Sequence, residues 1–278
     1  MGKSIGMNRE PATDPTALGR TFKQRLRDGD ILLGGMIMDI VRVPIVKLYR
    51  NAGFDFIYMD NEHVHMAGLP HMADFVLAAR DNQMPIIAKV PELTRIEAGR
   101  LLEAGVYGIQ LPRTETREQI RTLYDYMQFP PVGSRAGAPI YGNVDYSWPT
   151  DSRQWIENAN ESMLLVAHIE TRAAYENIDE IVSTPGVDMV YVGPYDFSIS
   201  MGQPGDYDHP DVAQGLQRVL DACLEHKVPF GTTASGPEAA ARWIDRGTQF
   251  FEVVDELSLI ARGAAETVDA YRKAVESA

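Results

Sequence analysis

Two carboxylates follow two apolar runs in the middle of this sequence of 278 residues. The run 163–169 ends at Glu170, and a second run near 190–192 leads to Asp196. Residues 172–185, between the two runs, have a helical pattern. Strand, helix and strand form a βαβ unit, which brings the carboxyl ends of two parallel strands to one edge of a sheet. Because carboxylate oxygens suit hard divalent cations, Glu170 and Asp196 are predicted metal ligands for Mg²⁺, Mn²⁺ or Co²⁺.

Each carboxylate also has a simpler interpretation, in which it stabilises the first turn of the helix that follows it. An acid in that position contributes only about 0.3–1 kcal/mol. The simpler interpretation suffices for either residue alone. For the pair the metal site is preferred, because both residues lie at the edge where parallel sheets hold their active sites.

A general base and a cation follow from two earlier strands. His63 comes just after the second apolar run, and an imidazole can take a proton from a hydroxyl or a water near neutral pH. Asp60 or Glu62 is expected to orient this histidine and to raise its basicity. Lys89 lies inside the third apolar run, where a lysine is costly unless it is paired or functional. It is predicted either to form a Schiff base or to face an anionic substrate as a cation.

These positions recur at regular intervals because apolar runs and helical patterns alternate along the chain. The strand-like runs are 31–38, 54–59, 84–90, 107–111, 163–169, 190–192, 228–234 and 250–254. Each is followed by a helix, and a further helix precedes the first run. Eight such units in a chain of this length predict an α/β fold, a (β/α)8 TIM barrel with an extra N-terminal helix. An open doubly wound sheet is disfavoured, because no Gly-x-Gly-x-x-Gly motif follows the first strand.

Domain organisation is expected to be simple. Residues 1–12 are predicted to be a flexible leader and residues 13–278 a single barrel domain that carries the catalytic site. The segment 129–149 is rich in Pro and Gly and longer than a usual connection between a helix and a strand. Its role stays open between a lid, a subunit contact and an ordered surface loop.

Composition narrows the class of partner. The formal net charge of −13 argues against nucleic acid or an anionic membrane as the main partner. The chain has neither an apolar run long enough to span a membrane nor a signal-peptide core near its first residue. One cysteine, Cys223, excludes an internal disulfide and fits a reducing compartment. We therefore expect a cytoplasmic protein that acts on a small molecule.

With these residues assembled, the chain resembles the metal-dependent 2-keto acid (pyruvate) aldolases of the HpcH/HpaI family, a branch of the phosphoenolpyruvate/pyruvate barrel superfamily. The resemblance runs from about residue 32 to the final helix. Its markers, specific in combination and order, are GFDFIYMDNEH at 53–63, LLEAG at 101–105, PPVGSR at 130–135, IETR at 169–172 and GVDMVYVGPYDFS at 186–198.

The resemblance implies roles for residues in this chain. Glu170 and Asp196 match the family's metal ligands, and His63 matches its base, which an acid at Asp60 assists. The backbone around Tyr195 and Asp196 resembles the family's binding place for the pyruvate carboxylate.

The resemblance also implies an assembly. Glu103 aligns with an acid that a neighbouring subunit supplies to tune the histidine. Members of the family are commonly homohexamers, built as trimers of dimers with exchanged C-terminal helices, so the last helix of this chain is expected to be swapped.

Three positions depart from the family's usual residues, and all three touch the expected substrate region. Lys89 stands in place of an arginine that stabilises the enolate, so the charge is kept but the planar fork is lost. His168 replaces a glutamine, and the bulky Tyr195 replaces a small residue. Lys89 is therefore expected to act in catalysis, and His168 and Tyr195 in substrate binding.

The function predicted from the sequence is that of a class II aldolase, a carbon–carbon lyase that depends on a divalent metal such as magnesium. It would cleave a 4-hydroxy-2-oxo acid to pyruvate and an aldehyde, or form it from them, through a metal-bound enolate. The alternative is a decarboxylase, or another carbon–carbon lyase or ligase, that uses the same metal site on a related 2-oxo acid. A Schiff-base aldolase through Lys89 and a non-enzymatic barrel that binds an oxo acid are weaker hypotheses. The first would leave Glu170 and Asp196 without a role.

Overall fold

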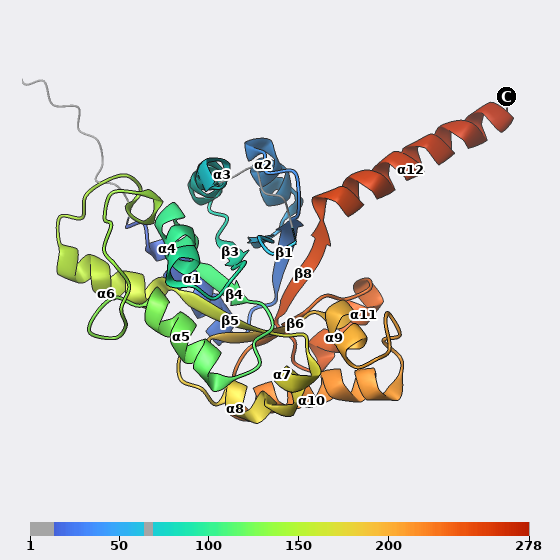
Figure 1. Cartoon of the computed structure of the whole chain (residues 1–278). Helices are drawn as coiled ribbons and strands as arrows, with labels where there is room; N and C mark the ends of the chain where they lie inside the picture. Colours follow the sequence, from blue (N-terminus) through green and yellow to red (C-terminus); the bar gives the residue numbers. More distant parts are fainter. Residues whose placement is uncertain (1–13, 64–68, 278) are drawn as a thin grey trace, which may run out of the picture.

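The computed structural model describes residues 14–63 and 69–277. Eight parallel strands close into a barrel in which each strand pairs with the next one along the chain and β8 pairs with β1 (Figure 1). The strands are β1 (Leu32–Ile37), β2 (Phe56–Met59), β3 (Ile86–Lys89), β4 (Gly108–Leu111), β5 (Leu164–Ile169), β6 (Met189–Val192), β7 (Phe230–Thr232) and β8 (Phe250–Asp255). The predicted (β/α)8 barrel is therefore confirmed, while the predicted leader 1–12 lies outside the described residues.

Helices surround the barrel, and one of them precedes the first strand, as predicted. They are α1 (Ala17–Asp28), α2 (Val43–Ala52), α3 (Leu69–Asp81), α4 (Arg95–Ala104), α5 (Arg117–Met127), α6 (Ser152–Ser162), α7 (Arg172–Glu176), α8 (Ile178–Val182), α9 (Pro194–Ser200), α10 (Pro210–His226), α11 (Pro237–Asp245) and α12 (Glu256–Glu276), with a 3₁₀ turn η1 (Gly142–Val144). Gly53 and Gly105 end α2 and α4 with φ angles of 97° and 100°, which an L side chain rarely adopts.

The helices differ from the sequence prediction at three places. The single helix expected over 172–185 is two short helices, α7 and α8, which meet at Asn177. Asn177 donates a side-chain hydrogen bond to the Glu115 carbonyl, 2.9 Å away, and this tertiary contact holds the junction. Helices α6 and α9 were not predicted. Asp151 begins α6 by accepting hydrogen bonds from the backbone amides of Arg153 and Gln154.

The lower interior of the barrel is a closed apolar layer. Phe56 and Phe250 stack there with their ring centroids 4.2 Å apart. Helix α1 covers the amino end of the barrel, where Phe22 meets Phe56 edge to face at 5.6 Å. Leu164 and Met189 belong to the same buried cluster. This end of the barrel is therefore a packed core, and ligands can enter only from the opposite end.

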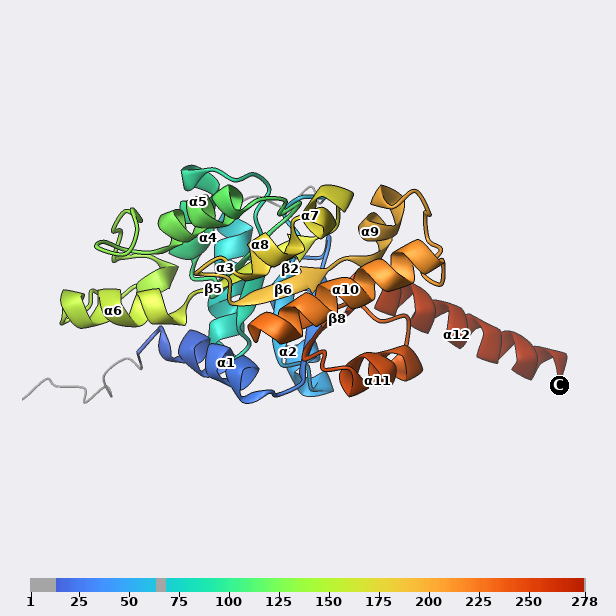
Figure 2. The same cartoon turned by 90° about the horizontal axis from the view of Figure 1, so that it is seen from below.

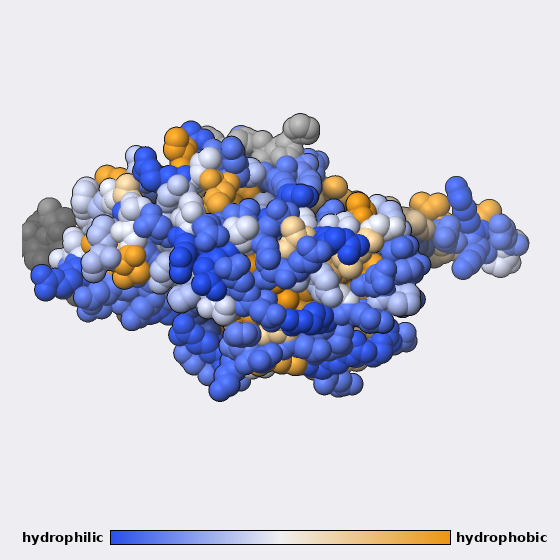
Figure 3. All heavy atoms as spheres, turned by 60° about the horizontal axis from the view of Figure 1, so that its bottom comes forward, coloured by the Kyte–Doolittle hydropathy of each residue, from blue (hydrophilic) through white to orange (hydrophobic). Residues whose placement is uncertain are grey.

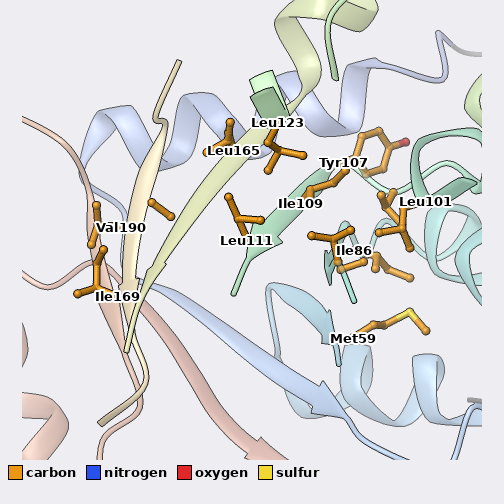
Figure 4. Packing of buried hydrophobic residues seen from close by; sticks show 14 of the residues in the cluster. Met59, Ile86, Leu101, Tyr107, Ile109, Leu111, Leu123, Leu165, Ile169 and Val190 are labelled. Carbon is orange, nitrogen blue, oxygen red and sulfur yellow. The ribbon is translucent and has the colours of Figure 1, made fainter. Parts of the chain in front are cut away.

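A second apolar core fills the space between the strands and the surrounding helices. Figure 4 shows part of this core, with Leu123 of α5 next to Leu165 of β5 and Leu101 of α4 near Ile86 of β3. Successive strand residues face opposite sides, so one strand supplies both cores. The large buried surface holds the strand ends, and with them the polar residues of the site, in fixed positions.

The upper interior of the barrel is polar. Residues two positions beyond the apolar interior layer also point inward, because strand side chains alternate. By this rule Lys89 follows Ile87, His168 follows Val166, and Glu252 follows Phe250. All three are buried, with exposed fractions of 3%, 4% and 2%. A change from apolar to polar along the barrel axis thus marks the end at which chemistry can occur.

Helix α12 projects away from its own barrel (Figures 1 and 2). Its first residue, Glu256, is the only buried residue among the described positions of the helix. Leu257 and Ile260 are exposed by 43% and 57%, and Leu33 and Val253 on the neighbouring strands β1 and β8 are each exposed by 40%. Elsewhere the visible surface is mostly hydrophilic (Figure 3). Both the helix and the strand pair beside it therefore present apolar surface to solvent.

Among the described residues, no helix combines the length and the apolar character that crossing a membrane requires.

Glu256 ties the start of α12 to the loop after β1, which leads to a first testable prediction. Its buried carboxylate accepts hydrogen bonds from the backbone amides of Met38, Asp39 and Ile40 at 2.7–3.1 Å. Glu256→Ala leaves these amides without an acceptor and is expected to lower the free energy of unfolding by about 2–4 kcal/mol. Urea unfolding measures this, with the exposed Glu225→Ala as control. Equal stability of the two variants would contradict the role assigned to Glu256.

Candidate active site

A cavity of about 580 Å³ opens at the carboxyl end of the barrel. Six of the residues predicted from the sequence line it, namely Asp60, His63, Lys89, His168, Tyr195 and Asp196. They come from the ends of β2, β3, β5 and β6 and from α9, so segments far apart in the chain meet here. Active sites of (β/α)8 enzymes lie at this end. The cavity is therefore the candidate active site.

Glu170 lies at the end of β5, beside the cavity, and is held from two sides. Its Oε1 accepts a hydrogen bond from the Arg113 backbone amide at 2.6 Å, and its Oε2 lies 3.3 Å from His168 Nε2. The helix that follows is capped by Thr171, whose hydroxyl accepts from the Ala174 amide. Helix capping consequently does not explain the position of Glu170.

Asp196 is the partner expected for Glu170. It lies in the first turn of α9, directly after β6, and is exposed at the cavity wall. Burial has the largest effect on the pKa of Glu170 and raises it. The charge of Lys89 and the hydrogen bond from the Arg113 amide lower this pKa, whereas the charges of Glu62 and Asp196 raise it further. A buried carboxylate beside others of like charge is the situation that a divalent cation relieves.

The available protein ligands fit a hard cation that leaves several coordination positions open to water and substrate. Within residues 14–63 and 69–277, no group of three His, Cys, Asp or Glu side chains is arranged to enclose a metal ion. Glu170 and Asp196 supply carboxylate oxygens from adjacent strand ends. Mg²⁺ and Mn²⁺ commonly bind to one or two carboxylates and complete their shell with water and substrate oxygens. The residues present therefore fit a catalytic metal better than a structural one.

Lys89 is a buried cation surrounded by acids. It forms an ion pair with Glu62. Burial alone would lower the pKa of Lys89, but the carboxylates of Glu170, Glu62 and Asp60 outweigh it and hold the pKa above its usual value. A Schiff-base nucleophile needs a neutral amine. The surroundings of Lys89 thus favour a fixed positive charge over a nucleophile.

His63 stands at the mouth of the cavity, where its side chain is 57% exposed. Its Nε2 lies 3.4 Å from Glu62 Oε2, so the same carboxylate faces both the imidazole and Lys89. Asp60 is turned to the backbone instead, because its Oδ1 accepts from the amides of Glu62 and His63 at 2.7 and 3.0 Å. Glu62, and not Asp60, is therefore the acid beside the imidazole, and Asp60 shapes the loop that carries it.

His168 and Tyr195 occupy different depths. His168 is buried beneath the cavity, where Gln110 Nε2 lies 3.4 Å from its Nδ1. Burial, followed by the charge of Lys89, lowers the pKa of His168 well below its usual value, so its imidazole is neutral. Tyr195 is 58% exposed and lines the cavity beside Asp196. The first residue can act on the inner part of a ligand and the second on the outer part.

Glu103 lies elsewhere. It is on α4, outside the barrel, and lines a separate small pocket with Arg135 and Tyr126. Burial lowers the pKa of Arg135 to about 10, and the charge of Glu103 opposes that effect. Glu103 does not reach the cavity of its own chain, so a part in the reaction would require a neighbouring subunit.

Several polar residues at the cavity floor were not singled out from the sequence. Gln110, Tyr191 and Glu252 are buried in β4, β6 and β8. Burial raises the pKa of Glu252 to about 8, against the opposing effects of Tyr191 and Lys89. The signal that could have identified Glu252 is a single acid inside the apolar run 250–254.

Comparisons with known proteins were made on sequence and on structure. The sequence model of the family described as HpcH/HpaI aldolase/citrate lyase matches residues 40–262. A hydroxypyruvate/pyruvate aldolase of Roseovarius nubinhibens is 28% identical over 252 residues, which cover 91% of this chain and 96% of that protein. A 5-keto-4-deoxy-D-glucarate aldolase of Salmonella arizonae is 27% identical over 227 residues, which cover 80% and 85%.

Solved structures give the same result. The crystal structure of an HpcH/HpaI aldolase from Desulfitobacterium hafniense is similar with a TM-score of 0.85 and 26% sequence identity, over 90% of this chain and 96% of that one. The family match spans the barrel from the loop after β1 into α12, including Glu170 and the six predicted residues that line the cavity. The chain thus belongs to the HpcH/HpaI aldolase/citrate lyase family and is a carbon–carbon lyase.

Proposed function

We propose that this protein is a metal-dependent aldolase that cleaves, and in reverse forms, a 4-hydroxy-2-oxo acid, with pyruvate and an aldehyde as the second pair of reactants. The observation that carries the proposal is the position of Glu170 and Asp196 at the ends of adjacent strands, with the buried cation Lys89 close to Glu170. A divalent cation held by these carboxylates would supply Lewis-acid polarisation of the 2-oxo group. Mg²⁺, Mn²⁺ and Co²⁺ all suit oxygen ligands of this kind.

The residues of the chain divide the remaining work. His63, at the cavity mouth, takes the proton of the substrate's 4-hydroxyl. The bond between C3 and C4 then breaks, C4 leaves as the aldehyde carbonyl, and the electron pair stays on the three-carbon fragment as an enolate. Lys89 stabilises the negative charge on the enolate oxygen, and the proton that His63 took is transferred to C3, which gives pyruvate and restores the neutral imidazole. Glu62 contacts the side chains of both His63 and Lys89, so it fixes the position of the base relative to the cation.

Two predicted roles concern the rest of the site. The backbone at Tyr195 and Asp196, in the first turn of α9, is proposed to bind the carboxylate of the oxo acid. Asp60 is proposed to set the orientation of His63 through the loop amides it binds, because its Oδ1 faces those amides.

A decarboxylase that uses the same carboxylates is the second candidate. The departures from the family's usual residues at Lys89, His168 and Tyr195 favour it, because all three line the cavity and change the groups that a substrate meets. Two kcat/KM values separate the two reactions. One is measured for CO₂ release from oxaloacetate, and the other for aldehyde release from a 4-hydroxy-2-oxo acid. The aldolase proposal requires the second value to be the larger.

A panel of aldehydes with pyruvate and with hydroxypyruvate, run with Mg²⁺, Mn²⁺ and Co²⁺, tests the proposal in the direction of bond formation. We expect at least one metal to support formation of a new carbon–carbon bond, detected as the 4-hydroxy-2-oxo acid by mass spectrometry. Product formation that is equal with and without metal would refute the metal-dependent form of the proposal.

We also propose that the protein assembles as a homohexamer, a trimer of dimers that exchange α12. The exposed apolar residues of α12 and those of β1 and β8 support this. Each of these apolar surfaces would be buried against the other if two subunits exchanged their last helices. In this assembly Glu103 is proposed to reach the site of a neighbouring subunit, as the resemblance to the family implies.

Removal of residues 261–278 tests the exchange. We expect the full chain to elute as a hexamer and the shortened chain as a smaller species, measured by light scattering after size exclusion. Glu256 is kept in the shortened chain, so that the loop it binds is not disturbed. A full chain that is monomeric at micromolar concentration, or an unchanged assembly after truncation, would contradict the proposal.

A further inference from the structure

The floor of the cavity contains hydrogen-bonding groups that the proposed reaction does not use. Glu252, Tyr191 and Gln110 all lie in the upper interior of the barrel, and their exposed fractions are 2%, 3% and 0%. Glu252 and Tyr191 line the cavity, whereas Gln110 lies behind His168. Polar side chains buried to this degree normally have a partner for each atom.

Part of this group is internally hydrogen bonded. Thr233 Oγ1 donates to the Glu252 backbone carbonyl at 3.1 Å, and the Tyr191 hydroxyl lies 2.6 Å from the same Oγ1. Because a threonine hydroxyl has one hydrogen, which the carbonyl takes, Tyr191 is the donor to Thr233. These bonds fix the wall of the floor. Tyr191 and Gln110 also approach the Glu252 carboxyl and lower its pKa against burial, but its Oε1 stays without a hydrogen-bond partner.

Two oxygen atoms at the floor have no hydrogen-bond partner in the described part of the chain, Oε1 of Glu252 and Oε1 of Gln110. Lys89, the nearest cation, is already paired with Glu62. A buried acceptor that stays unpaired carries the full cost of its desolvation. A hydrogen-bond donor at the floor would therefore be stabilised by these two oxygens, for which the described residues provide no donor within hydrogen-bond distance.

We propose that Glu252, with Gln110 behind it and Tyr191 beside it, forms a subsite that binds a hydroxyl group of the substrate. This inference rests on the proposed aldolase function and adds the substrate class, a hydroxylated reactant in place of an alkyl one. A methyl or methylene group at the floor would leave the acceptor unpaired. A second carboxylate or a phosphate on the substrate would be repelled by the carboxyl oxygens of Glu252 and Asp60. A hydroxyl donates to the free oxygen and brings no charge.

The protonation of Glu252 agrees with a neutral ligand. Burial raises the pKa of this carboxyl to about 8, so it is mostly uncharged at neutral pH. An uncharged carboxyl does not attract a cationic amine, and it presents a carbonyl oxygen as acceptor and a hydroxyl as donor. Glutamine has nearly the same shape and the same two kinds of hydrogen-bonding atom. Glu252→Gln should therefore keep the subsite, while Glu252→Met removes it with similar volume.

Two pairs of matched compounds test the proposal, because each pair exchanges a hydroxyl for a methyl group of similar size. Hydroxypyruvate and 2-oxobutyrate are compared as oxo acids, and glycolaldehyde and propanal as aldehydes, with the metal-loaded enzyme. We expect the wild type to prefer the hydroxylated member of at least one pair by roughly 10- to 100-fold in kcat/KM. Glu252→Met should reduce that ratio to about one, and Glu252→Gln should keep it.

Met36→Leu is the control, since Met36 lines the same cavity without a polar group and should leave the ratio unchanged. A Kd ratio for hydroxypyruvate and 2-oxobutyrate, measured by calorimetry, gives a second readout that does not depend on turnover. A ratio of about one in the wild type, or a ratio that Glu252→Met leaves intact, overturns the subsite. Turnover of propanal and pyruvate by the wild type reports separately on the proposed aldolase function, so the two failures are distinguishable.

Discussion

Glu170→Gln is expected to lower kcat by about 10³-fold or more at saturating Mn²⁺. The amide keeps the size of the side chain and its hydrogen bond from the Arg113 amide, but it removes one of the two charged ligands proposed for the metal. Asp196→Asn should have a comparable effect, and chelation of the wild type should reach the same low rate. Turnover and Mn²⁺ binding, followed by electron paramagnetic resonance, are measured together.

Glu176→Gln is the matched control for this substitution. Glu176 is an exposed acid at the end of α7, six residues farther along the chain, and should leave both turnover and metal binding unchanged. If Glu170→Gln keeps full turnover and binds Mn²⁺ as the wild type does, the metal site has been placed on the wrong residues.

Lys89→Met is expected to lower kcat by about 10²- to 10³-fold with a smaller change in KM. The buried ammonium is proposed to hold charge that develops on the enolate oxygen, and an interaction made mainly in the transition state appears in kcat. Lys89→Arg should recover much of the loss, because it restores a cation at a position surrounded by acids. Lys47→Met, at an exposed position on α2, is the control.

The same variants distinguish a fixed charge from a covalent nucleophile. If Lys89 formed a Schiff base, borohydride with substrate would trap an adduct on the wild type, and Lys89→Arg would be as inactive as Lys89→Met. We expect no adduct and a substantial difference between the two variants. A trapped adduct at Lys89 would refute the role proposed for it.

The barrel could be predicted because strand positions are local properties of the chain. Each of the predicted apolar runs, from three to eight residues long, forms a strand close to its expected bounds, as at 107–111 and 163–169. Short helices were harder to predict. The break between α7 and α8 depends on the contact from Asn177 to the Glu115 carbonyl, which lies far away in the sequence. Helix α6 follows a Pro- and Gly-rich stretch whose composition concealed its Asp151 cap.

The candidate site was predictable only in part. Residues at strand ends, such as His63 and Asp196, meet in one cavity because parallel strands present their carboxyl ends together. The floor depends on which side of each strand faces inward after the barrel closes. The register between β1 and β8 shifts at Gly34 and Gly35, next to Glu252, and no local pattern in the sequence indicates that shift. The pairing of Lys89 with Glu62 likewise appears only in three dimensions.

The central claim, metal-dependent cleavage of a 4-hydroxy-2-oxo acid, is tested most directly by one measurement of both products. Chelated protein is given 4-hydroxy-2-oxopentanoate with and without added Mg²⁺, Mn²⁺ or Co²⁺, and pyruvate and acetaldehyde are quantified over time. The account predicts that the two products appear in equal amounts, only after metal is restored, and not with Glu170→Gln. Equal rates with and without metal, or pyruvate formed without aldehyde, would contradict it.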